Sequence, residues 1–385
     1  MSGSMREWTG RGQRPSRWFR INLWLHRWTS IVATLPFLVL CVTGIALIFH
    51  EELDAALGVV PGASVPTQSR IADCLAQATR DFPDQRIISV GLDPERHPGV
   101  FLVVLNALEA TGFDGAKLSF YDLGTSKRLG ESDPSKTFTG VLLELHAEWF
   151  MGPLGRLLGA LVGLLVTVSL LSGLVIYAPY MRKVVFGSIR WARGQRLTQL
   201  DLHNFIGAMV LGWAVVVSAT GFMLGFSQVA LGLWQYTDLS ELRREFAQAE
   251  PVDVRSPPAS AAQIIAAQEA SAPPGWGVRS VIYPGTELTT PRHYGVIMGG
   301  SQGLDAQLLD VTLVDAATGK VARKIEMPAY LQAIFLAEPL HFGNYGGLAL
   351  KLLWALCSLL TLFITLNGAW LFFDRRRARS LSGAV

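Results

Sequence analysis

The sequence is poor in charged residues. Only 16% of its 385 residues are charged, against about 25% in a typical soluble domain. Half of the residues are hydrophobic, and the excess lies in four uncharged runs: Ile31–Phe49, Leu157–Met181, Phe205–Phe226 and Leu352–Phe373. About 20 apolar residues span a bilayer as a helix. The sequence therefore predicts four membrane helices and excludes a soluble globular protein.

Cysteine is also scarce. Of the three cysteines, Cys41 and Cys357 lie inside apolar runs, and only Cys74 lies outside them. The sequence has no CxxC, CxxCH or cysteine cluster, which excludes iron–sulfur sites and covalently attached haem. It also has no GxGxxG or Walker loop, so we expect no NAD(P)H- or ATP-binding site. We expect no nucleic-acid partner either.

The basic residues are unevenly distributed. The segments before the first run, between the second and third, and after the fourth carry 6, 5 and 4 Lys/Arg, with only Glu7, Asp201 and Asp374 among them. The two remaining segments contain 18 basic and 27 acidic residues. By the positive-inside rule, both termini are cytoplasmic and the two large segments are exported. We expect a bacterial inner membrane protein with two periplasmic domains.

The second half of the chain repeats spacings of the first half. In each half, a Leu-His pair is followed by a Thr-Gly pair at the same offset, and a later histidine is followed by two glycines at matching offsets. The equivalent positions are Leu25-His26 and Leu202-His203, Thr43-Gly44 and Thr220-Gly221, His146 and His341, Gly152 and Gly347, and Gly173 and Gly368. Because both halves begin and end inside, we expect parallel repeats related by an axis along the membrane normal.

The two exported segments match as well. Each has a helical pattern, a strand-like stretch containing Ser-Val, and an Asp-x-x-Thr turn signature beginning at Asp122 or Asp315. We therefore expect a polytopic α-helical membrane protein of four transmembrane helices in two parallel repeats, each with a periplasmic α+β insert. The expected divisions are a cytoplasmic N-terminus 1–22, helix 23–50, first periplasmic domain 51–145, helix 146–181, cytoplasmic loop 182–199, helix 200–227, second periplasmic domain 228–340, helix 341–373 and cytoplasmic tail 374–385.

Four of the seven histidines form the repeat-related pairs. A pseudo-two-fold axis along the membrane normal would bring His26 opposite His203 on the cytoplasmic side, and His146 opposite His341 on the periplasmic side. Two facing imidazoles between helices are the usual axial ligands of a b-type haem. Ionisable groups inside a membrane bundle are costly and favour a functional role. The sequence thus predicts two bis-histidine haems, with a single haem and purely structural histidines as the alternatives.

Small neighbours are consistent with haem binding, because a porphyrin needs room beside its ligand. Ser30 and Gly207 lie four residues after the cytoplasmic-side histidines, and Gly152 and Gly347 follow the periplasmic-side ones. His50 has no histidine counterpart in the second half. It either replaces one ligand of the outer haem or lines the exit toward substrate.

The remaining histidines and the aromatic residues of the exported segments indicate less. We expect His97 and His293 at the surface of the periplasmic domains. Aromatic residues such as Tyr283 and Tyr294 are more typical of a small domain's core than of a substrate site. No substrate-contacting residue is assigned from the sequence.

Together, the Leu-His and Thr-Gly spacings, the His146 and His341 segments, and the turns at Asp122 and Asp315 resemble the PepSY-associated transmembrane family. The resemblance covers residues 20–377. Within the family, the chain is most similar to inner-membrane siderophore-iron reductases of the FoxB-like, ferrioxamine-reducing type.

That resemblance implies an electron relay. Electrons would enter at the His26/His203 haem, pass to the His146/His341 haem, and reduce a ferric siderophore in the periplasm to release Fe(II). The expected partners are the ferric siderophore, membrane lipid, and a cytoplasmic or quinol electron donor that the sequence does not identify. Alternative functions are a quinol-linked cytochrome with another periplasmic acceptor, a non-redox regulator or sensor, and a permease for the iron chelate.

Overall fold

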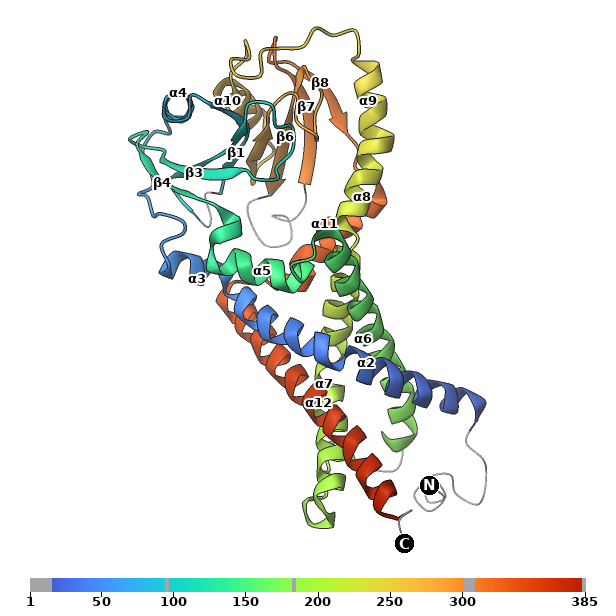
Figure 1. The fold of residues 1–385 in the computed structure, drawn as a ribbon. Helices are drawn as coiled ribbons and strands as arrows, with labels where there is room; N and C mark the ends of the chain where they lie inside the picture. Colours follow the sequence, from blue (N-terminus) through green and yellow to red (C-terminus); the bar gives the residue numbers. More distant parts are fainter. Residues whose placement is uncertain (1–15, 94–96, 182–184, 301–308, 383–385) are drawn as a thin grey trace.

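The computed structural model describes residues 16–93, 97–181, 185–300 and 309–382. A β-sheet domain is stacked on a bundle of long helices, and the start of α2 and the end of α12 lie away from the sheet (Figure 1). Within these residues, four helices are long and apolar enough to cross a membrane. The chain is therefore a membrane protein, as the apolar runs predicted.

The four long helices form a closed ring. They are α2 (Arg17–Ile48), α6 (Gly152–Met181), α7 (Gln195–Leu224) and α12 (Gly347–Ser382). Both α2 and α7 contact α6 and α12, so α2 and α7 lie diagonally opposite each other. Many of their leucines and valines are exposed outward, as expected for side chains that face lipid.

A short helix precedes each returning span. These are α5 (Phe138–Glu148) and α11 (Ala329–Phe342). The first ends at Trp149 and the second at Gly343, both with left-handed backbone conformation. The next helices begin at Gly152 and Gly347, where φ is again positive. The returning spans therefore begin six residues later than the expected starts at 146 and 341, because these left-handed residues interrupt helical hydrogen bonding.

Helical structure also continues outward from the other two spans. After α2 comes α3 (His50–Ala56). After α7 come α8 (Ser227–Trp234), the π-helical turn η3 (Gln235–Leu239) and α9 (Ser240–Glu245). The chain thus stays helical well past residue 227, where we expected the third span to end.

One mixed domain contains strands from both of the large segments that connect the spans, one between α2 and α6 and one between α7 and α12. In the described residues, β1–β8 form a single antiparallel sheet in the order β4-β3-β2-β1-β5-β6-β7-β8. Helix α4 (Ile71–Asp81) precedes β1, and α10 (Ala261–Ser271) precedes β5. The strands are Gln85–Leu92, Val100–Ala107, Lys117–Asp122, Arg128–Ser132, Trp276–Ile282, His293–Gly300, Leu309–Asp315 and Val321–Ile325.

The two segments join through β1 and β5. These strands pair with Val90 opposite Val281, the two valines of the matching Ser-Val motifs. The sequence predicted a domain in each segment but not that they would share a sheet. Joining them removes two sheet edges that would otherwise carry unpaired backbone groups.

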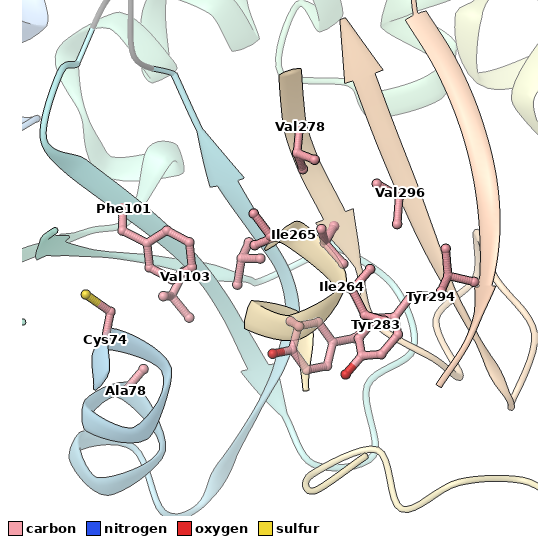
Figure 2. Packing of buried hydrophobic residues seen from close by; sticks show 14 of the residues in the cluster. Cys74, Ala78, Phe101, Val103, Ile264, Ile265, Val278, Tyr283, Tyr294 and Val296 are labelled. Atoms are coloured by element: carbon pink, nitrogen blue, oxygen red, sulfur yellow. The ribbon is translucent and has the colours of Figure 1, made fainter. Parts of the chain in front are cut away.

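Both faces of the sheet are covered. Helices α4 and α10 pack on one face through residues such as Ala78 and Ile264, and Ile264 lies near Tyr283 and Tyr294 (Figure 2). Val314 of β7 belongs to this core. Its neighbour Leu313 points to the other face and packs in a second cluster with α8, η3, β8 and α11.

The predicted turns are confirmed. Asp122 Oδ1 accepts hydrogen bonds from the backbone N–H groups of Gly124 and Thr125, between β3 and β4. Asp315 Oδ1 accepts the equivalent pair from Ala317 and Thr318, between β7 and β8. The hydrogen bond from Thr125 lowers the pKa of the Asp122 carboxyl.

One surface prediction is wrong. His293 is only 2% exposed, its Nδ1 lies 2.7 Å from Thr290 Oγ1, and its ring packs on Phe246. It lies on β6, an inner strand paired with both β5 and β7 and covered on both faces. His97, by contrast, is partly exposed.

Candidate functional site: two layers of facing histidines

The inner pair lies between the diagonal helices of the bundle. His26 projects from α2 and His203 from α7, with ring centroids 6.4 Å apart. His203 follows Asp201, whose carboxylate is bound by the Arg190 guanidinium. The structure therefore brings these two histidines together although they come from opposite halves of the sequence.

The outer pair lies between the two short helices. His146 projects from α5 and His341 from α11, with ring centroids 6.3 Å apart. Burial lowers the pKa of His146 to about 3 and also lowers the pKa of His341. Both imidazoles are therefore neutral at neutral pH, which is the form that binds a metal.

Each of the four rings packs closely on a glycine from the same half of the chain. A Cβ on these glycines would lie 2.9 to 3.2 Å from the histidine Cε1. The contacts are Gly173 with His26, Gly368 with His203, Gly44 with His146, and Gly221 with His341. These are the repeated glycines of the sequence, and their role is to admit an imidazole against the helix backbone.

Hydrogen bonds define which nitrogen is protonated in three of the rings. His26 Nδ1–H donates to the carbonyl of Ser169, at 2.8 Å, and His341 Nδ1–H donates to that of Val217, at 2.9 Å. A carbonyl oxygen can only accept, so Nδ1 carries the proton and Nε2 keeps its lone pair. Nε2 is then available as a metal ligand in both rings.

His146 reaches the same state through a threonine. Thr43 Oγ1 donates to the carbonyl of Val39, at 2.7 Å, and lies 2.7 Å from His146 Nδ1. Because its only proton is used in the first bond, the hydroxyl accepts from Nδ1–H. Thr220 makes the corresponding contact to His341 at 3.2 Å. The repeated Thr-Gly motif thus provides a hydrogen-bond acceptor and space for the ring, roles that the sequence did not reveal.

His203 is held differently. Ile364 provides the backbone contact that Ser169 provides for His26, but without the geometry of a full hydrogen bond, and no described residue satisfies Nδ1. On the other side of the pair, Ser30 and Ser169 hydroxyls lie 2.6 Å apart next to His26. The two inner ligands are therefore not equivalent.

The two layers are well separated. His26 and Thr43, which contacts the outer pair, both lie on the continuous helix α2. At a rise of 1.5 Å per residue, the stretch of helix between them is about 25 Å long. One layer therefore lies near each end of the membrane-spanning part of α2.

The pair geometry fits a metal held between two imidazoles. Two rings that share one metal through Nε2, with metal–nitrogen distances of about 2.0–2.1 Å, have centres roughly 6–6.5 Å apart. The observed separations, 6.4 and 6.3 Å, agree. Across the described part of the chain, no group of three or more His, Cys, Asp or Glu side chains converges. The donor sets are pairs, which suits a haem whose porphyrin supplies the other four nitrogens.

The residues expected to make room for a porphyrin differ in their roles. A Cβ on Gly207, one turn from His203, would meet no atom within 4 Å, so that position faces open space. Ser30 instead bonds to Ser169. Gly152 and Gly347 begin helices with positive φ rather than packing on a ring.

His50 lies at the start of α3. Its Nδ1 lies 2.9 Å from the carbonyl of Leu47. The ring opposite His146 is that of His341, not that of His50. Next to His50, Glu51 and Glu52 bind the buried ammonium of Lys351 on α12, at 2.6 and 2.8 Å. This ion network joins α3 to the last span.

Comparison with known proteins identifies a relative and a family. Over 260 residues the chain is 26% identical to uncharacterized protein PA4219 of Pseudomonas aeruginosa, covering 61% of this chain and 63% of that protein. The chain thus spans less than two thirds of the length of this curated relative. The family model for the PepSY-associated TM region matches residues 23–375, which include the sheet domain, both histidine pairs and nearly all of the four spans. The chain belongs to the family of the PepSY-associated TM region.

Proposed function

We propose that this protein is an inner-membrane di-haem b reductase that passes electrons across the bilayer to a ferric siderophore in the periplasm. The observation that carries the proposal is the meeting of four repeat-related histidines in two layers, at separations that suit bis-imidazole ligation. A membrane regulator or a permease has no need of two such layers.

His26 and His203 would hold one haem, and His146 and His341 the other. Haem, when bound, supplies one-electron transfer. The chain's own part is to hold each imidazole neutral and oriented. The Ser169 and Val217 carbonyls and the Thr43 hydroxyl retain the Nδ1 proton and direct Nε2 away from the supporting helix.

We also propose that the two halves are parallel repeats, with both termini cytoplasmic. In the sheet, β1 to β4 extend from the centre to one edge and β5 to β8 extend from the centre to the other, with Val90 and Val281 paired between β1 and β5. This symmetric arrangement supports the repeat. The 15 basic residues in the three sequence segments that lack the sheet strands support the orientation. The outer pair and the sheet would then face the periplasm.

The substrate chemistry suits a one-electron carrier. Siderophores bind Fe(III) through hard anionic oxygens, and Fe(II) binds such ligands less strongly. One electron taken up by Fe(III) yields Fe(II), which leaves an intact chelator. The electron comes from a cytoplasmic or quinol donor on the inner side.

The first experiment is a dithionite-reduced minus oxidised spectrum of the detergent-purified protein, with pyridine-haemochrome quantification. We expect b-type bands and two haems per chain. His97→Ala, outside both pairs, is the matched control and should retain both haems. A protein that stays colourless after haem-replete expression would overturn the proposal and favour a regulator.

A second experiment identifies the acceptor. The anaerobically reduced protein is mixed with ferric siderophore and a chelator that becomes coloured with Fe(II). We expect the haem bands to re-oxidise with one Fe(II) formed per electron. Re-oxidation by a quinone alone, with no Fe(II), would instead favour a quinol-linked cytochrome.

A further inference from the structure

A cavity lies at the end of the sheet, between helices α4 and α10. It has a volume of about 230 Å³ and is lined by residues of both helices, the start of β1, and the segments around Tyr283 and Ser256. That volume corresponds to roughly seven or eight water molecules. Leu75, Phe82 and Pro257 contribute apolar surface to its wall. It lies in the sheet domain, outside both histidine layers.

Arg86 is a buried cation in the wall of this cavity. The residue is 5% exposed, and its Nη2 donates to the carbonyl of Pro284 at 2.6 Å. Its Nε has no hydrogen-bond partner among the described residues. The lining contains no Asp or Glu. A buried guanidinium without an anionic partner is costly, so its presence requires compensation.

Tyr283 places a second donor in the same wall. Its ring is 5% exposed and packs edge-on against Tyr294, with centroids 5.2 Å apart (Figure 2). Tyr294 Oη donates to the carbonyl of Ala259, at 3.1 Å. For Tyr283 Oη, the described part of the chain provides no hydrogen-bond acceptor. The wall of the cavity therefore includes a phenol and a guanidinium that each have a donor without an acceptor among the described residues.

The corresponding place in the second half has the opposite character. Val90 and Val281 are paired in the sheet, and Arg86 and Gly277 lie at the same distance before them in the sequence. Arg86 and Gly277 are therefore equivalent positions of the two halves. Beside Gly277, the carboxylate of Glu269 accepts the backbone N–H of Val278 at 2.6 Å. Arg86 is therefore not part of the repeated framework, which argues against a purely architectural role.

We propose that this cavity binds a small organic carboxylate, with Arg86 and Tyr283 as its hydrogen-bond donors. Of the two arginines in the lining, Arg86 is buried, whereas Arg255 is exposed and donates to the carbonyl of Pro83 at 2.6 Å. One buried guanidinium and one neutral phenol balance a single negative charge, which suits a carboxylate better than a divalent phosphate. The apolar part of the wall suits an organic body. The site is independent of the haem proposal, and the experiment below uses no redox signal.

The test is thermal unfolding and calorimetric titration of the full chain in detergent with acetate, hexanoate and benzoate as probes. Benzamide is the uncharged match for benzoate. We expect benzoate or hexanoate to raise the Tm in a saturable manner and benzamide to have no effect. Arg86→Gln should weaken binding at least tenfold and Tyr283→Phe about three- to tenfold, while the exposed Lys117→Gln leaves it unchanged.

Several outcomes would overturn the proposal. These are benzamide binding as well as benzoate, Arg86→Gln binding as tightly as the natural chain, or none of the three carboxylates shifting the Tm. Stabilisation by inorganic phosphate in place of the carboxylates would assign the cavity to a different ligand. If Arg86→Gln fails to fold, Tyr283→Phe decides, because unchanged benzoate affinity in that variant contradicts the proposed contact.

Discussion

The inner and outer histidine pairs have nearly the same ring separation but are built from different kinds of helix. His26 and His203 lie on two long spans, α2 and α7, so the bundle itself sets their distance. His146 and His341 lie on α5 and α11, short helices that connect the sheet domain to the returning spans. The outer pair therefore depends on where the sheet domain holds these two helices.

The two pairs also differ in the hydrogen bonds that support their imidazole rings. Both outer rings are supported by a threonine of the span that packs against their own helix, Thr43 on α2 or Thr220 on α7. In the inner pair, His26 is bonded to a carbonyl, while His203 Nδ1 has no full partner among the described residues. A layer with supported ligands on short connecting helices and a layer with unequal ligands on long spans should respond differently to substitution.

Removing a ligand is the largest expected effect. His203→Ala and His341→Ala should each lower haem content from two per chain to one, because each leaves the other pair intact. The loss of either layer should reduce ferric-siderophore reduction at least a hundredfold. Pyridine-haemochrome analysis and the Fe(II) assay measure both. Loss of both haems from either single variant would show that the layers are not independent.

Filling a glycine next to an outer ring comes second. In Gly221→Ala, the added Cβ would lie 2.9 Å from His341 Cε1, so we expect a cost of about 1–3 kcal/mol and loss of the outer haem. The control is Gly212→Ala on the same helix, where a Cβ meets no atom within 4 Å. The control should retain both haems and gain stability by helix propensity. Equal behaviour of the two variants in haem content and thermal unfolding would contradict the close-packing account.

The ion network under the outer layer gives a smaller effect. Lys351→Met removes the buried partner of Glu51 and Glu52 and should cost about 2 kcal/mol, because the carboxylates are only partly accessible to water. Lys324→Met, which breaks the exposed pair with Asp310, should cost less than about 1 kcal/mol. Thermal unfolding of both variants measures the difference. A Lys351 variant as stable as the Lys324 control would show that α3 is not held by this network.

The smallest expected effect is on redox potential. Thr43→Val removes the acceptor for His146 Nδ1–H, which makes the ligand less basic and should raise the outer midpoint potential. A loss of about 1 kcal/mol corresponds to a shift on the order of 40 mV for one electron. Thr220→Val should shift it less, because His341 keeps the Val217 carbonyl.

Spectroelectrochemical titration resolves the two layers. Thr34→Val, on the same helix but bonded only to the Ser30 carbonyl in its turn, is the control and should leave the outer potential unchanged. A Thr43→Val shift in the inner rather than the outer potential would reverse the proposed assignment of the layers.

Much of the architecture was predictable because its signals are local. Apolar runs predicted the four spans, and Asp-x-x-Thr predicted the turns at Asp122 and Asp315, which depend on contacts within a few residues. The repeated offsets also selected the four histidines that the structure brings together. The breaks at Trp149 and Gly343 were missed, since both lie before the uncharged runs, which begin at Leu157 and Leu352.

The sequence by itself determined the spans, the turns and which histidines correspond, because hydropathy, turn chemistry and repeat spacing are properties of the chain alone. The tertiary structure decided what those residues contact. Ser169, Gly173, Gly221 and Val217 support their histidines from other helices. The joining of β1 to β5 and the burial of Arg86 likewise depend on packing between distant segments. Such contacts leave no local pattern, so they emerged only from the folded chain.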